Sequence, residues 1–184
     1  MKIPDSKRRK ALVIVDVQGS FLSPRNEYIV KNILSLLDTV DYDSYINATF
    51  HAEKGSLWDM QQGWTCPAGP ETQTIPALAQ KLKQYDVIEV SKETKSIFKG
   101  NQDVTKSLRE DNIQELHIVG LDTNDCVLAT AFEAFDHGFF TYVIEECCQS
   151  SASNESHENG LKILRGQDMT NNSCVESIVF TIIK

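Results

Sequence analysis

Residues 119–138, VGLDTNDCVLATAFEAFDHG, decide the fold that we predict for this chain. The apolar run of residues 116–119 is typical of a buried strand, and the apolar residues after Cys126 recur at helical spacing. The stretch therefore predicts a strand, a tight loop and a helix that begins at Cys126. Gly138 is suited to the position just beyond the end of that helix.

Cys126, at the start of the predicted helix, carries the most reactive side chain in this stretch. A thiol there lies beside free backbone N–H groups and the positive end of the helix dipole, which favour the thiolate and make it a candidate nucleophile. The alternative is a small buried side chain, which is the usual fate of a free cysteine. From the loop alone, both interpretations stay open.

Outward from this unit, strand-like and helix-like segments alternate along the whole chain. Residues 11–15 form a continuous apolar run, typical of a central parallel strand covered on both faces. Further strands are predicted at residues 45–49, 87–90, 140–144 and 175–183, and helices at residues 29–37, 75–82, 104–110 (with Asp103 as N-cap) and 157–164 (capped by Ser153 or Asn154). This alternation predicts a three-layer, doubly wound α/β fold, with a mainly parallel sheet and helices on both faces.

Size and charge limit the classes of protein to which the chain can belong. With 184 residues, of which 41% are hydrophobic, residues 1–184 suit a single domain with a substantial core. The formal net charge of −8 argues against a nucleic-acid partner, whose binding requires many cationic groups. No run approaches the roughly 18 apolar residues of a membrane span, and the N-terminus lacks a secretory signal pattern. We therefore expect a cytoplasmic protein without a membrane partner.

The cysteines and the single basic run favour structural interpretations. The cysteines are odd in number and lack CxxC spacing, which indicates reduced thiols rather than a disulfide framework or a zinc knuckle: Cys66, Cys126, Cys147, Cys148 and Cys174. Residues 7–10, KRRK, are interpreted as a solvated lead-in to a strand, with a targeting or anion-binding patch as the alternative.

Three chemically active side chains follow three different predicted strands. Asp16 ends the first apolar run, Lys92 follows residues 87–90, and Cys126 follows residues 116–119. Because parallel strands place their carboxyl ends at one edge of the sheet, these side chains are predicted to meet there. Asp16 would then accept the thiol proton, and Lys92 would favour the thiolate. The alternative for Asp16 alone is a residue that caps the following turn.

These residues also carry a family resemblance that covers nearly the whole chain. LVIVDVQ (residues 12–18), followed by Phe21, resembles a first-strand motif with a catalytic aspartate. KETKSIF (residues 92–98) is similar to a second motif, whose spacing selects Lys92 over Lys95, and GLDTNDCVLAT (residues 120–130) resembles a nucleophile motif. The chain thus resembles the isochorismatase-like cysteine hydrolases, which include nicotinamidases, N-carbamoylsarcosine amidases and related small-amide hydrolases.

The resemblance implies a mechanism as well as a fold. It implies Asp16, Lys92 and Cys126 as a catalytic triad, and a non-proline cis peptide at Leu121–Asp122. The N–H groups of Asp122 and Cys126 would then point at one position and form an oxyanion hole. A small-molecule substrate, no cofactor and a homo-oligomer are also implied.

The sequence departs from the metal-binding members of that family. Those members carry an Asp-x-His pair after the second strand, where this chain reads Thr49-Phe-His51, and Thr65-Cys66 replaces an expected His-Cys. One imidazole is a poor metal site, so no metal is predicted. The presence of Cys126 argues against isochorismatase proper, in which vinyl-ether hydrolysis proceeds without that thiol.

Residues 52–74 are predicted to be an irregular loop that forms a lid or pocket wall. Phe21 and one of Trp58 or Trp64 would form an aromatic wall for a small flat substrate, or belong partly to the core. His51 would line the pocket, or else be structural. The sequence thus predicts metal-free hydrolysis of a small amide-like substrate through a thioester; a metal-assisted, nicotinamidase-like enzyme and a non-catalytic binding protein are the alternatives.

Overall fold

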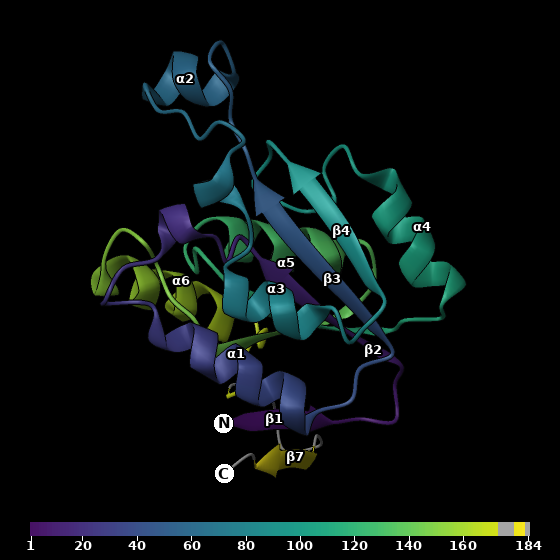
Figure 1. Ribbon diagram of the computed structural model, residues 1–184. Helices are drawn as coiled ribbons and strands as arrows, with labels where there is room; N and C mark the ends of the chain where they lie inside the picture. Colours follow the sequence, from purple (N-terminus) through teal and green to yellow (C-terminus); the bar gives the residue numbers. More distant parts are fainter. Residues whose placement is uncertain (173–178, 183–184) are drawn as a thin grey trace.

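The computed structural model describes residues 1–172 and 179–182, and its centre is a five-stranded sheet. The strands lie in the order β4-β3-β2-β5-β6, and all four neighbouring pairs are parallel. Their bounds are β2 (Lys10–Val15), β3 (Ser44–Phe50), β4 (Val87–Lys92), β5 (Glu115–Gly120) and β6 (Phe140–Cys148). The chain adds β3 and β4 on one side of β2 and then returns to add β5 and β6 on the other (Figure 1).

Helices cover both faces of this sheet, which confirms the predicted three-layer fold (Figure 1). One face packs against α1 (Tyr28–Thr39) and α3 (Pro76–Leu82), and the other packs against α4 (Gln102–Glu110) and α5 (Cys126–Asp136). Leu164, from α6 (Asn154–Arg165), joins the second layer. None of the helices among the described residues is long and apolar enough to cross a membrane.

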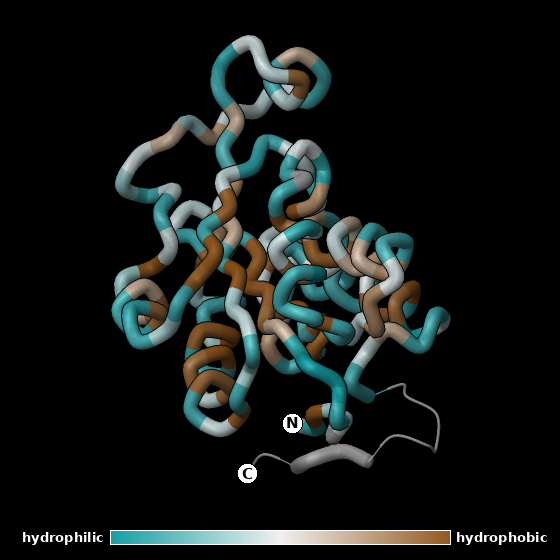
Figure 2. The backbone as a smooth tube through the Cα atoms, turned by 90° about the vertical axis from the view of Figure 1, so that its right-hand side faces the viewer, coloured by the Kyte–Doolittle hydropathy of each residue, from teal (hydrophilic) through white to brown (hydrophobic). Residues whose placement is uncertain are grey.

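The continuous apolar run in β2 is explained by this double coverage. Ala11, Val13 and Val15 belong to the cluster beneath α4 and α5, whereas Leu12 and Ile14 belong to the cluster beneath α1 and α3. Successive side chains of a strand point to opposite faces, so a strand buried on both sides is apolar at every position. Figure 2, in which the backbone is coloured by residue hydropathy, shows hydrophobic residues concentrated at the centre of the molecule.

Both ends of the chain meet in a second, small sheet that the sequence did not predict. β1 (Lys2–Asp5) pairs antiparallel with β7 (Val179–Ile182), apart from the central sheet (Figure 1). The strand expected at residues 175–183 is described at residues 179–182, where it pairs antiparallel outside the central sheet; residues 175–178 and 183 lie outside the described residues. β1 escaped prediction because it is only 4 residues long and its sequence, KIPD, carries no apolar pattern.

Other sequence predictions need smaller corrections. Asp103 lies in the first turn of α4, and Asn101 is the N-cap residue, without a side-chain cap. Ser153 is the N-cap of α6, and its hydroxyl accepts a hydrogen bond from the Ser156 N–H. In the basic run, the Arg8 guanidinium lies 3.5 Å from the centre of the Phe140 ring, which supports a packing role rather than an anion site. The described cysteines are free and buried, and Cys174 lies outside the described residues.

The segment predicted to be wholly irregular contains one α-helix and one 3-10 turn. α2 (Leu57–Gln62) forms a lobe beyond the carboxyl end of β3, and η2 (Pro70–Thr72) returns toward the body (Figure 1). The Ser56 hydroxyl accepts a hydrogen bond from the Asp59 N–H at 3.3 Å and begins the helix, which ends at Gly63 with a φ of 66°. α2 has only 6 residues, too few for helical periodicity to stand out in the sequence.

Two glycines allow the loop before Cys126 to lie close to its neighbours. Gly120 has a φ of 117°, and a Cβ there would lie 2.0 Å from the Val15 carbonyl oxygen. A Cβ at Gly160 of α6 would lie 2.8 Å from Asn124 Cα and from the Thr123 carbonyl oxygen. Only glycine fits such approaches of one backbone to another. The loop is therefore fixed between β2 and α6.

Candidate active site

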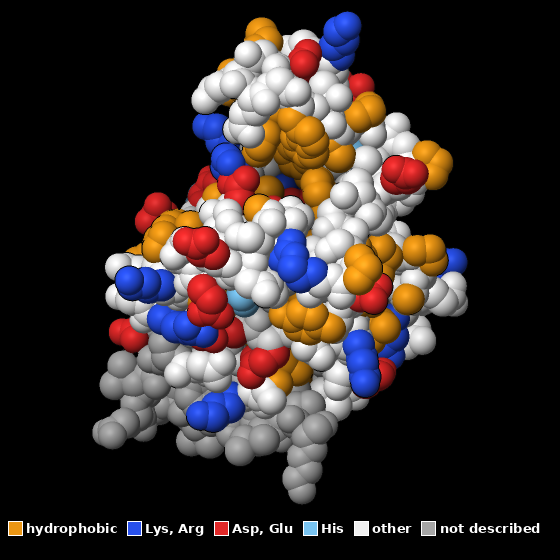
Figure 3. All heavy atoms as spheres, turned by 90° about the vertical axis from the view of Figure 1, so that its left-hand side faces the viewer, with side chains coloured by type: hydrophobic (Ala, Val, Ile, Leu, Met, Phe, Trp, Pro, Cys, Tyr) orange, Lys and Arg blue, Asp and Glu red, His pale blue; other side chains and the backbone are white. Residues whose placement is uncertain are grey.

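A cavity of about 340 Å³ opens at the carboxyl ends of the central strands. It lies beside the point between β2 and β5 where the strand order reverses, the usual ligand site of an open α/β sheet. Figure 3 shows hydrophobic side chains gathered in the hollow beneath the projecting α2 lobe. The cavity is lined by Asp16, Ser20, Phe21, Phe50, Trp58, Trp64, Leu121, Asp122, Asp125, Cys126 and Ser151.

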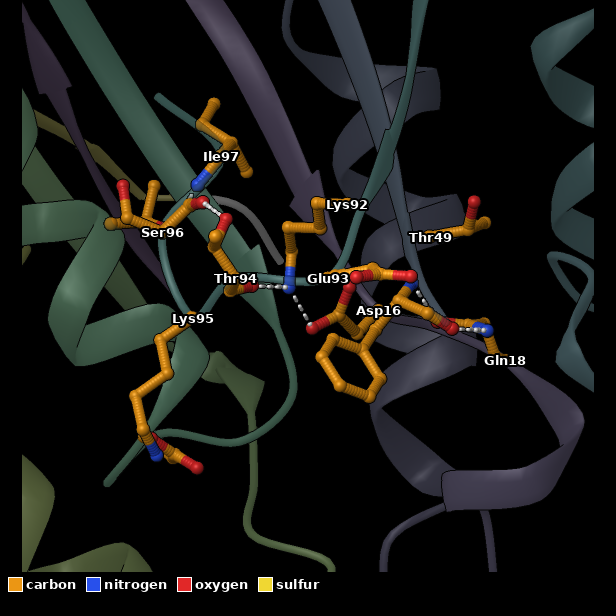
Figure 4. Close-up of polar contacts among 12 residues, drawn as sticks. Asp16, Gln18, Thr49, Lys92, Glu93, Thr94, Lys95, Ser96 and Ile97 are labelled. Atoms are coloured by element: carbon orange, nitrogen blue, oxygen red, sulfur yellow. Dashed lines mark hydrogen bonds and ion pairs between the residues drawn. The ribbon is translucent and has the colours of Figure 1, made fainter. Parts of the chain in front are cut away.

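Asp16 and Lys92 form a buried ion pair at the base of this cavity. Lys92 Nζ lies 2.7 Å from Asp16 Oδ2, and the two side chains are 0% and 3% exposed. The same ammonium donates a hydrogen bond to the Thr94 carbonyl oxygen at 3.1 Å (Figure 4). β3 brings the two together, because the Asp16 N–H bonds to Ala48 O and Lys92 is the register partner of Phe50. The structure thus places Asp16 and Lys92 together, as the sequence predicted.

Asp16 has the electrostatics of a proton acceptor. Burial raises the pKa of Asp16 to about 6, although the Lys92 charge lowers it. Its second carboxylate oxygen, Oδ1, is buried without a close partner among the described residues, and a hydrogen bond from the Cys126 thiol to the carboxylate lowers the Asp16 pKa. An unpartnered carboxylate oxygen beside the cavity can take up a proton from a neighbouring group.

Cys126 is the first residue of α5 and lines the cavity next to Asp16. Burial and the Asp16 charge raise the pKa of the Cys126 thiol well above its usual range, although Lys92 lowers it. Burial and the adjacent carboxylate therefore act against the preference for the thiolate that the helix terminus provides. Because each of the two groups shifts the pKa of the other, Asp16 and Cys126 titrate together rather than independently.

The loop between β5 and Cys126 contains the expected cis peptide bond, at Leu121–Asp122. Within residues 1–172 and 179–182, the N–H groups of Asp122 and Cys126 have no hydrogen-bond acceptor. Ser151 fixes the Asp122 carboxylate, which accepts hydrogen bonds from the Ser151 N–H at 2.7 Å and the Ser151 hydroxyl at 2.6 Å. Burial raises the pKa of this carboxyl group.

Four aromatic rings form one wall of the cavity. Phe50 and Trp64 stack with ring centres 5.8 Å apart, and Trp58 meets Phe50 edge to face at 5.0 Å. Phe21 lies 6.2 Å from Trp64. Both tryptophans therefore face the site, where the sequence predicted one or the other. Phe50 was missed because it continues the apolar pattern of β3.

His51 does not line this cavity, which contradicts the interpretation that it lines the pocket and leaves the structural one. Thr49 and His51 line a separate hollow, and their side chains lie 3.4 Å apart. The reason is the two-residue period of an extended chain, which turns Phe50 toward Cys126 and its two neighbours away.

Sequence reasoning also missed Gln18, which holds the cavity wall together. Its fully buried amide accepts a hydrogen bond from Phe50 N–H at 2.7 Å and donates to the carbonyl oxygens of Phe50 and Thr72. It therefore ties the chain after β2 to the end of β3 and to η2. Gln18 ends the motif LVIVDVQ (residues 12–18), and this position two residues after Asp16 could have indicated a role at the site.

The polar residues near the site do not fit a metal centre. Among the described residues, no group of three His, Cys, Asp or Glu side chains is arranged to hold a metal ion. His51 neighbours Thr49 rather than a carboxylate, and its Nδ1 is buried without a partner. Three or four such ligands are usual for a bound zinc ion.

A doubly wound parallel sheet with a carboxylate, an ammonium and a thiol at its switch point defines a class of α/β protein with a candidate nucleophile pocket. A family model, the isochorismatase domain, matches residues 10–176. Since that match spans most of the chain, the chain belongs to the isochorismatase family.

One curated relative is the uncharacterized isochorismatase family protein PncA of Bacillus subtilis (strain 168). The two chains are 34% identical over 83 residues, which cover 45% of this chain and 44% of the relative. The chain thus aligns with less than half the length of the curated relative.

Solved structures share the fold across almost the whole chain. An isochorismatase-like hydrolase from Alkaliphilus metalliredigens is 21% identical with a TM-score of 0.73, and covers 88% of this chain and 92% of its own. A pyrazinamidase of Pyrococcus horikoshii in complex with zinc is 20% identical (TM-score 0.72; 88% and 97% covered). PnC1 from L. infantum in complex with nicotinate is 14% identical (TM-score 0.77; 92% and 95% covered). At these identities the similarity concerns the fold alone.

Proposed function

We propose that this isochorismatase-family hydrolase cleaves the C–N bond of a small amide through a Cys126 thioester, without a metal. The observation that carries the proposal is the buried Asp16–Lys92 ion pair next to a thiol that lines the cavity. A thiol with an adjacent proton acceptor is the arrangement that nucleophilic catalysis requires. The names pyrazinamidase and nicotinamidase, borne by solved structures of the same fold, are consistent with amide substrates.

In the first step, Asp16 Oδ1 takes the proton from Cys126 Sγ as the sulfur attacks the amide carbonyl carbon. The transfer is favourable as attack proceeds, because a proton on Asp16 removes the charge that raises the thiol pKa. Lys92 stays paired with the carboxylate and offsets the single negative charge that thiol and carboxylate share. No free thiolate is needed in the resting enzyme.

The carbonyl oxygen becomes an oxyanion as the tetrahedral intermediate forms. The N–H groups of Asp122 and Cys126, which have no acceptor in the described chain, would donate to it. Loss of one such donor typically slows a reaction by about 10²–10³. When the intermediate collapses, the C–N bond breaks and Asp16 returns its proton to the leaving amine. Asp16 then takes a proton from water as that water attacks the thioester carbonyl. The C–S bond breaks to release the acid, and Asp16 returns the proton to Cys126 Sγ.

The proposal is tested by measuring ammonia released from a panel of small amides, ureas and carbamoyl compounds. The wild type should release ammonia from at least one of them, and Cys126→Ala should reduce that rate to background. Cys147→Ala is the matched control, because Cys147 is also buried but lies in the core beneath α1 and not in the cavity. Added hydroxylamine should divert the thioester to a hydroxamate. Turnover by Cys126→Ala at the wild-type rate would rule out the covalent route.

A further inference from the structure

We infer that the cavity selects its amide substrate by charge and that its substrate is a cationic small amide. The inference rests on the proposed function for its chemistry, but on separate residues for its recognition. These residues are the carboxylates and aromatic rings that a bound ligand would face.

The charged side chains that line the cavity are all aspartates. Asp16 lies at its base, and Asp122 and Asp125 flank Cys126 on the side of the loop. Among the described residues, no lysine, arginine or histidine lines the cavity. Because the Asp122 carboxylate receives both the N–H and the hydroxyl of Ser151, it is fixed in position as a hydrogen-bond acceptor.

Three cations lie near the cavity but do not line it. Arg25 donates to the carbonyl oxygens of Ser150 and Ser151, and its charge lowers the pKa of Asp122. The Lys92 side chain is fully buried beneath the cavity and is occupied by Asp16 and the Thr94 carbonyl. Lys95 forms an ion pair with Asp125 and lies on the far side of Trp58, in a separate hollow, with Nζ 4.7 Å from the ring centre. Of the two lysine–aspartate pairs, only the aspartates line the cavity.

The opposite wall adds to the same preference. The faces of Phe21, Phe50, Trp58 and Trp64 carry negative electrostatic potential, which attracts a cation and repels an anion. Lys95 over Trp58 and Lys92 over Phe50, at 4.7 and 5.1 Å, already show rings of this wall with a cation on one face. An anionic group would lose its water here and gain no counter-charge at the surface. Charge thus discriminates where a purely aromatic wall would select only by shape.

The experiment measures binding separately from turnover. Purified Cys126→Ala is titrated calorimetrically at about pH 8, where a carboxyl with the raised pKa of Asp16 is ionised. Three probes of matched shape are used: benzamide, its meta N-methylpyridinium analogue, and its meta carboxylate analogue. We expect the cation to bind at least roughly tenfold more tightly than the anion, with benzamide between them.

Two variants should change this preference in opposite directions. Asp125→Asn removes a lining carboxylate and frees Lys95, so the ratio of cation to anion affinity should fall. Lys95→Gln removes the cation behind Trp58 and frees Asp125, so the ratio should rise. Both side chains are partly exposed, which makes folding of the variants straightforward to verify.

The outcomes separate this inference from the proposed function. If the cation does not bind more tightly than the anion, including the case in which neither binds measurably, the inference is overturned whatever the enzyme hydrolyses. If Cys126→Ala binds the probes in the expected order but the wild type hydrolyses no amide, the proposed function fails and the charge selection stands.

Discussion

At the residue scale, the site depends on how Asp16 and Cys126 share one proton. Burial raises the pKa of both groups, the Asp16 charge raises that of the thiol further, and Lys92 partly offsets the rise in both. The pair then has two arrangements, thiol with carboxylate and thiolate with carboxylic acid. Attack on a carbonyl uses the second, which is formed by a proton transfer inside the cavity.

The pH dependence of kcat/KM should report this pair. Asp16 must be ionised to take up the thiol proton, so the rate should fall as pH falls through about 6, the raised pKa of Asp16. Initial rates on an identified amide between about pH 4.5 and 8 would measure this acid limb. That range extends from near the ordinary carboxyl pKa of about 4 to well above the raised pKa of Asp16. In Asp16→Asn the residual rate should lack the limb. An unchanged limb in that variant would assign the ionisation to another group.

Removal of Lys92 should destabilise the protein and displace the same limb. Lys92→Met leaves the buried Asp16 carboxylate without its counter-ion, which typically costs about 3–5 kcal/mol. The pKa of Asp16 should rise, since its ion pair lowers it, and the acid limb should move to higher pH. Urea unfolding and the pH–rate profile measure the two effects.

Lys95→Met is the control for that stability change. Lys95 also pairs with an aspartate, but its side chain is 47% exposed, so its loss should change stability by no more than about 1 kcal/mol. Equal destabilisation by the two substitutions would contradict a special contribution of the buried pair.

At the element scale, strand periodicity made most of the central sheet predictable from the sequence. Apolar and β-branched runs located its strands, and the rule that parallel strands place their carboxyl ends at one edge correctly predicted that Asp16 and Lys92 meet. The direction of His51 was not predictable, because it depends on which face of β3 the pocket adjoins. β1 and α2 are too short to show a periodic pattern. Both contact residues that are distant in the sequence: β1 pairs with β7, and Trp58 of α2 packs against Phe50.

The contact between α6 and the nucleophile loop gives a test at this scale. In Gly160→Ala, the new Cβ would lie 2.8 Å from backbone atoms of Thr123 and Asn124, so the loop or the helix must shift. Stability should fall by about 1–3 kcal/mol, and activity should fall further because Asp122 and Cys126 move with the loop. Thermal unfolding and initial rates measure these losses.

Gly166→Ala, just beyond the end of α6, is the matched control. Its Cβ would meet the nearest backbone oxygens at 3.4 Å, and its φ of −66° suits alanine. Stability should stay unchanged or rise slightly. If both substitutions had the same effect on activity, the close contact at Gly160 would not position the loop.

At the scale of the whole molecule, a buried polar network lies on the central sheet, remote from the cavity. His117, on β5, is hydrogen-bonded through both ring nitrogens. Nδ1 lies 3.0 Å from the Tyr42 hydroxyl, and Nε2 lies 2.9 Å from the Glu115 carboxylate. The Ser6 hydroxyl donates to the same carboxylate at 2.7 Å. The network joins Ser6, which follows β1, to β5, and so links the small terminal sheet to the central sheet.

This network should make stability depend on pH. Burial lowers the pKa of His117, so as pH falls through about 6.5 the unfolded chain takes up a proton that the folded chain refuses, and folding weakens. The raised pKa of Asp16 acts in the opposite direction near pH 6, so the informative quantity is the difference between the wild type and His117→Gln. Urea unfolding at about pH 7.5 and 5.5, on either side of the ordinary histidine pKa, should show less acid destabilisation in the variant than in the wild type. His137→Gln, at a partly exposed position, should behave like the wild type. If His117→Gln lost as much stability on acidification as the wild type does, the folded protein would have to bind a proton at His117.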